Sequence, residues 1–137
     1  MIDKPRYSHA TKVAQKILKE IQINNPPVDI NNILQHLGIN LLPYAFPEKV
    51  SAILLKENNM FVVGVNDKHH PNRQRFSIAH EIGHFLIHKD RPFVDSFTAG
   101  ETFYRDGIGD EKLEKEANFF AANLLMPAEK INPPYFW

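Results

Sequence analysis

The chain has 137 residues, and its 16 basic and 16 acidic side chains give a formal net charge of zero at pH 7. Zero net charge does not favour direct binding to nucleic acid, and the absence of cysteine excludes disulfides and thiolate metal sites. A hydrophobic content of 43% and a charged content of 23% are typical of soluble globular proteins.

The N-terminus lacks the apolar run of a signal peptide, and no stretch approaches the roughly 18 apolar residues of a membrane span. We therefore expect a cytoplasmic protein without a membrane anchor. A chain of this length can form one hydrophobic core. We expect a single domain over residues 1–137, with residues 1–7 and 128–137 as loose tails.

The first part of the chain predicts two helices and a strand. Apolar residues recur at helical spacing over Tyr7–Ile23, which predicts an amphipathic helix. A short second helix over Asp29–Leu37 would have Asp29 as its N-cap and Gly38 as its C-cap. Ile39–Leu42 follows as a strand.

A β-hairpin is predicted next. Ser51–Leu55 and Met60–Val65 have the composition of strands, and the polar tetrapeptide Lys56–Asn59 between them suits a turn. With helices before and after these strands, we expect an α+β fold in which helices pack on a small sheet of about three strands.

The sequence His80-Glu81-x-x-His84 lies in a predicted helix over Arg73–His88, with Asn72 as its N-cap. This helix is apolar on almost all sides, so we expect it at the centre of the core. Residues four apart share one helix face. Both imidazoles can therefore reach one Zn²⁺ at its usual distance of about 2.0–2.1 Å. Glu81 would flank the metal, where a general base is needed.

Other histidines and one glycine of this region have simpler interpretations. His69 and His70 precede the helix and are either auxiliary ligands or, as we favour, solvated loop residues. Gly83 lowers helix propensity by about 1 kcal/mol relative to alanine, which indicates that another backbone approaches closely there. The alternative to a metal site is an amphipathic helix with incidental histidines.

A third ligand is needed, because catalytic zinc sites usually have three protein ligands and a water. We expect it on a final helix over Asp110–Met126, where Glu114 lies on the flank of the core face. Glu116 is the alternative, although the helical wheel turns it toward solvent. His88 is a less favoured ligand and more suited to be a cation at the helix end or to assist a ligand. Asn118 is positioned to hydrogen-bond a ligating histidine.

Two segments together resemble the ImmA/IrrE family of metallopeptidase-like proteins, namely residues 75–84 with the H-E-x-x-H pattern and residues 114–127, EKEANFFAANLLMP. The similarity extends over roughly residues 8–128. It implies a compact zincin-like domain of the gluzincin kind, found in bacteria and their mobile elements. By motif position, His80, His84 and Glu114 would bind Zn²⁺ and Glu81 would be the catalytic base. The resemblance further implies that a helix-turn-helix transcriptional repressor is cleaved and repression relieved.

The leading hypothesis is a zinc endopeptidase acting on a protein substrate. An extended substrate segment is expected beside the strand Met60–Val65. The oxyanion donor would be Tyr104, in the long connection over residues 89–109, or one of the histidines His69, His70 and His88. The alternative is a non-proteolytic regulatory or toxin-like module that binds a transcription regulator on the same scaffold.

Overall fold

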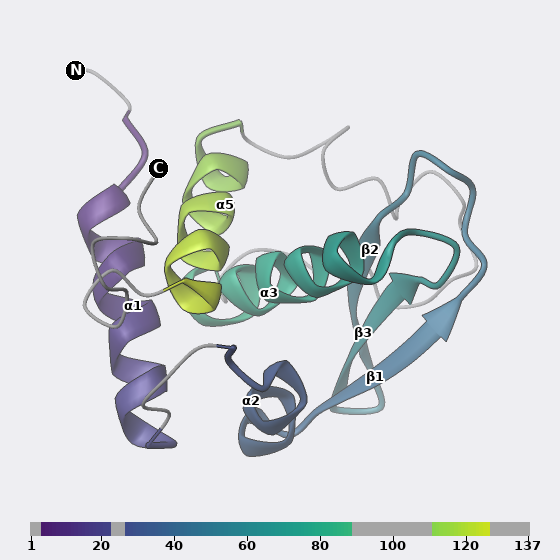
Figure 1. Ribbon diagram of the computed structural model, residues 1–137, viewed down its shortest axis with the longest axis horizontal. Helices are drawn as coiled ribbons and strands as arrows, with labels where there is room; N and C mark the ends of the chain where they lie inside the picture. Colours follow the sequence, from purple (N-terminus) through teal and green to yellow (C-terminus); the bar gives the residue numbers. More distant parts are fainter. Residues whose placement is uncertain (1–3, 23–26, 89–110, 127–137) are drawn as a thin grey trace.

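A computed structural model describes residues 4–22, 27–88 and 111–126, and it has the expected α+β architecture. Its elements in chain order are α1 (Tyr7–Glu20), α2 (Ile30–Leu37), β1 (Ile39–Tyr44), β2 (Ala52–Glu57), β3 (Met60–Asn66), α3 (Pro71–Ile87) and α5 (Glu111–Leu125). Helix α3 crosses the middle of the molecule, with α1 and α5 at one end and the strands at the other (Figure 1). The predicted central position of the H-E-x-x-H helix is confirmed.

Helix α2 has the caps that the sequence predicts. The Asp29 carboxylate accepts hydrogen bonds from the backbone N–H groups of Asn31 and Asn32, and these are two of the donors that a helix start leaves free. Gly38 ends the helix with a left-handed backbone at φ 73°. This conformation is easily adopted by glycine and leads directly into β1.

The sheet has three strands in the order β1-β3-β2, with β1 parallel and β2 antiparallel to β3. The predicted hairpin is present, but its strands extend into the expected tetrapeptide. The turn is therefore only Asn58-Asn59, both with positive φ (51° and 64°), as tight hairpin turns require. Since β3 is the central strand, the expectation that a substrate pairs beside Met60–Val65 is wrong. Strands β1 and β2 form the two edges.

Helix α3 begins earlier than predicted. Its N-cap is His70, whose Nδ1 accepts the backbone N–H of Asn72 at 3.0 Å, and Pro71 is the first helical residue. Proline suits this position because its φ is already helical and no N–H is needed there. The prediction of Asn72 as the cap is therefore wrong by two positions.

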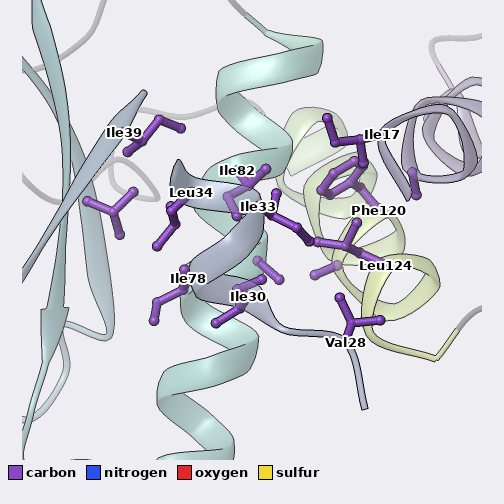
Figure 2. Close-up of a cluster of buried hydrophobic side chains, with 14 of the residues drawn as sticks. Ile17, Val28, Ile30, Ile33, Leu34, Ile39, Ile78, Ile82, Phe120 and Leu124 are labelled. Carbon is purple, nitrogen blue, oxygen red and sulfur yellow. The ribbon is translucent and has the colours of Figure 1, made fainter. Parts of the chain in front are cut away.

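One hydrophobic core joins all the described helices and strands. Phe120 and Leu124 of α5 lie against Ile33 of α2 and Ile82 of α3, and Ile17 of α1 closes one side (Figure 2). Each of these five side chains is at most 4% exposed. The core thus holds α5 against α3.

A smaller hydrophobic cluster covers the other face of the sheet. It is formed by Phe46, Val50, Ile53 and Leu55. Buried Asn66 anchors the loop between β1 and β2, because its side-chain Nδ2 donates to the carbonyl oxygens of Phe46, Pro47 and Val50 at 2.8–3.2 Å. Among the described residues, no helix is long and apolar enough to span a membrane.

Candidate metal centre

Three side chains from two helices converge on one point. His80 and His84 lie one turn apart on α3, with their Nε2 atoms 3.1 Å from each other. Glu114 of α5 places its Oε1 atom 2.9 Å from Nε2 of His80 and 3.2 Å from Nε2 of His84. These residues form a group that could hold a metal ion.

The geometry and chemistry of this cluster fit a metal. The triangle of Nε2, Nε2 and Oε1 atoms is small enough for one point to lie about 2.0–2.1 Å from all three, the usual distance for Zn²⁺. The second carboxylate oxygen of Glu114 is buried and has no hydrogen-bond partner among the described residues. Two imidazoles and one carboxylate without a thiolate form a donor set typical of catalytic zinc.

Electrostatic coupling within the cluster is strong. Burial by itself raises the pKa of Glu114, but hydrogen bonds from His80 and His84 outweigh it and hold this pKa below its usual range. Burial lowers the pKa of His80, but the hydrogen bond to Glu114 and the charges of Glu81 and Glu114 raise it above its usual value. The site therefore favours positive charge next to the carboxylates.

The close approach of α5 to α3 depends on Gly83. A Cβ atom at this position would lie 2.9 Å from Cδ1 of Phe120 and 3.3 Å from the backbone Cα of Ala117. Both distances are shorter than ordinary carbon contacts. The expectation that Gly83 admits another backbone is confirmed, and this approach brings Glu114 to the histidines.

The two histidines of the cluster have different partners on their other ring nitrogens. Nδ1 of His80 is 2.7 Å from Oδ1 of Asn118, as the sequence predicts. Nδ1 of His84 is 2.8 Å from Nδ1 of His88, whose Nε2 is 2.8 Å from Oε1 of Glu116. Both nitrogens of each imidazole are therefore engaged, which fixes the ring orientations.

The structure corrects the expectation for Glu116 and decides between two expectations for His88. Glu116 does not face solvent but is completely buried, because Arg6 covers it from the start of α1. Of the two roles predicted for His88, the structure does not support a cation at the helix end but agrees with a residue that assists a ligand, because His88 is buried and contacts His84. Burial is the largest influence on it and lowers its pKa to about 4. No local sequence signal connects Arg6 with Glu116, which lie 110 positions apart.

The remaining candidates lie outside the cluster. His69 is buried, not solvated, and its Nε2 lies 2.9 Å from the carbonyl oxygen of Glu48. His70 caps α3. Glu81 is 4% exposed and close enough for its charge to raise the pKa of His80. Tyr104 lies outside the described residues.

Residues 34–135 match the family described as the IrrE N-terminal-like domain. The chain belongs to this family. The expected resemblance to ImmA/IrrE proteins is therefore confirmed, and this IrrE-like chain is a member of a metalloprotease family with a His-His-Glu cluster.

Two relatives of this IrrE-like chain differ in how much of their length the match covers. An uncharacterized immunity region protein of Bacillus phage phi105 is 23% identical over 123 residues, which cover 88% of the chain and 70% of the phage protein. The radiation response metalloprotease IrrE of Deinococcus deserti is 37% identical over 71 residues, which cover 52% of the chain. The match to this metalloprotease spans only 24% of its length.

Proposed function

We propose that this chain is a zinc endopeptidase whose metal is held by His80, His84 and Glu114. The observation that supports this proposal is the convergence of two Nε2 atoms and one carboxylate oxygen within 2.9–3.2 Å of one another. We further propose that residues 1–137 act as one domain, since all described helices and strands share a core.

Zn²⁺ in such a site acts as a Lewis acid that makes water more acidic and polarises a carbonyl group. Glu81 follows His80 on α3 and lies beside the cluster, so its carboxylate is suited to accept a proton from the attacking water and return it to the leaving amine. His84 is buried and His80 is partly buried, and the hydrogen-bond partners of their Nδ1 atoms keep both Nε2 atoms directed at one point.

The substrate that we propose is a helix-turn-helix transcriptional repressor, cleaved to relieve repression. The name of the phage relative, an immunity region protein, supports a setting of this kind. An extended substrate segment is suited to an open sheet edge. Helix α3 packs against both β2 and β3, and β2 is an edge strand, so we propose that the substrate segment pairs with the outer edge of β2.

The decisive test replaces Glu81 by glutamine. Glu81→Gln retains shape and zinc but removes the base, and general bases contribute roughly 10²–10⁴-fold to rates. The substrate for this test is a repressor encoded beside the gene, and mass spectrometry of the fragments measures its cleavage. We expect the rate of cleavage to fall at least about 100-fold. Unchanged cleavage would remove Glu81 from the mechanism. Full relief of repression in cells by this variant would instead favour the non-proteolytic binding module.

Metal content distinguishes the two glutamates. We expect about one zinc per chain in the wild type. At saturating zinc, Glu116→Ala should retain this content and Glu114→Ala should lose it. The reverse pattern would identify Glu116 as the ligand, and a wild type that binds no added zinc would contradict the peptidase.

A further inference from the structure

A chain of buried polar groups runs from His84 to the surface of the molecule. His84 contacts His88, His88 contacts Glu116, and Glu116 is bound by Arg6. His88 is 4% exposed and Glu116 is fully buried, whereas half of the Arg6 side chain (51%) is exposed. His88 lies at the end of α3, Glu116 lies in the middle of α5, and Arg6 directly precedes α1.

The order of donors and acceptors along this chain has only one solution when His84 is a ligand. A ligating Nε2 has no proton, so the proton of neutral His84 is on Nδ1 and is donated to Nδ1 of His88. A neutral imidazole has one N–H, so the proton of His88 is on Nε2 and is donated to Glu116. Glu116, as an acceptor, thereby determines the tautomer of His88, and His88 determines the tautomer of His84.

Arg6 completes this arrangement at Glu116. Its backbone N–H donates to Oε2 at 2.6 Å, and its guanidinium donates to Oε2 from Nε and to Oε1 from Nη2, each at 3.2 Å. An unpaired buried carboxylate would be strongly destabilising. Arg6 therefore lets Glu116 remain an ionised acceptor for His88.

We propose that His88, Glu116 and Arg6 are positioning residues that hold His84 in the orientation and tautomer that metal binding requires. This inference rests on the proposed function, in which His84 is a zinc ligand. Among the described residues, His80 has no such chain and has only the amide of Asn118 behind it. His84 is thus the histidine whose alignment depends on a series of connected residues, the last of which precedes the first helix.

The test compares four variants of the full chain by their zinc affinity, measured in competition with a chelator, and by the visible absorption of the Co²⁺-loaded protein. Changes in partners behind a ligating histidine typically weaken metal binding about 10–100-fold. We expect His88→Leu to fall in this range and to change the Co²⁺ spectrum. His88→Gln, whose amide can also accept and donate, should recover most of the affinity.

Arg6→Met should weaken zinc binding measurably but by no more than about tenfold, because the backbone N–H still reaches Glu116. Lys4→Met makes the same change of charge at an exposed position two residues earlier and should leave affinity and spectrum unchanged.

The outcomes separate this inference from the proposed function. Wild-type zinc affinity and an unchanged Co²⁺ spectrum in His88→Leu would overturn the positioning chain and leave the peptidase intact. Failure of the wild type to bind zinc would overturn the proposed function itself. If His88→Leu does not fold, Arg6→Met decides, and wild-type affinity in that variant would overturn the proposal.

Discussion

Glu114 and Glu116 stand two positions apart on α5, yet their carboxylates have different neighbours. Glu114 contacts the two histidines of the H-E-x-x-H helix, and Glu116 contacts His88 and Arg6. Burial raises the pKa of Glu116, but the hydrogen bonds from Arg6 and His88 lower it to about 2. The same side chain thus acts as a candidate ligand at one position and as an anchor at the other.

Gly83 is the residue on which the distance between α3 and α5 depends. We expect Gly83→Ala to lower the free energy of unfolding, because overpacking costs about 1–3 kcal/mol while alanine gains about 1 kcal/mol of helix propensity. Urea denaturation measures the difference. Repeating the substitution in a Phe120→Leu background should show coupling of at least about 0.5 kcal/mol, since Phe120 is the nearest obstacle. Additive effects would contradict this account.

Substitution of Asn66 measures how much its buried hydrogen-bond donor contributes to stability. Asn66→Ala should destabilise the protein by about 1–3 kcal/mol, because the buried carbonyl of Val50 loses the amide donor, whereas that of Pro47 still accepts the backbone N–H of Val50. Asn66→Asp keeps the shape but exchanges the donor for a charged acceptor that faces the same carbonyls. We expect its unfolding midpoint in urea to lie below that of Asn66→Ala. An aspartate variant as stable as the wild type would show that the amide does not anchor the loop.

At the scale of whole elements, the helices begin and end through different means. Helix α2 begins on a side-chain cap, Asp29, and ends on the left-handed backbone of Gly38, whereas α3 begins on a histidine followed by proline. Helix α1 has no side-chain cap at Arg6. The buried partner of Arg6 on α5 compensates for this by binding its backbone N–H.

Asp29→Ala removes the acceptor for two N–H groups at the start of α2. We expect a loss of about 1 kcal/mol in the free energy of unfolding, since capping residues contribute about 0.5–2 kcal/mol. Asp29→Ser keeps an acceptor and should recover most of this loss in the same denaturation measurement. Equal stability of the alanine and serine variants would show that the cap is not the cause.

For the whole molecule, the proposed metal would connect α3 and α5, which already share the core. A metal that binds only the folded state stabilises it by about 2.7 kcal/mol at a concentration of 100 times its Kd. We expect added zinc to raise the melting temperature of the wild type and not that of Glu114→Ala. An equal rise in both proteins would indicate binding elsewhere.

Much of this protein is determined by the sequence alone, because the signals involved are local. Helical periodicity predicted α1, α2 and α5, the Asp29 and Gly38 caps were correct, and two asparagines marked the hairpin turn. The spacing of His80 and His84 was sufficient to place both imidazoles on one helix face. Each of these features depends on residues within a few positions of one another.

Only the tertiary structure decided what lies opposite each local feature. From its helical position alone, Glu116 was predicted to face solvent. In the structure it is buried, because Arg6, from the other end of the chain, covers it. The hairpin did not reveal that β1 pairs with β3 and makes it central. Partners distant in sequence are selected by the packing of one element on another, and that selection leaves no periodic or short-range pattern in the chain.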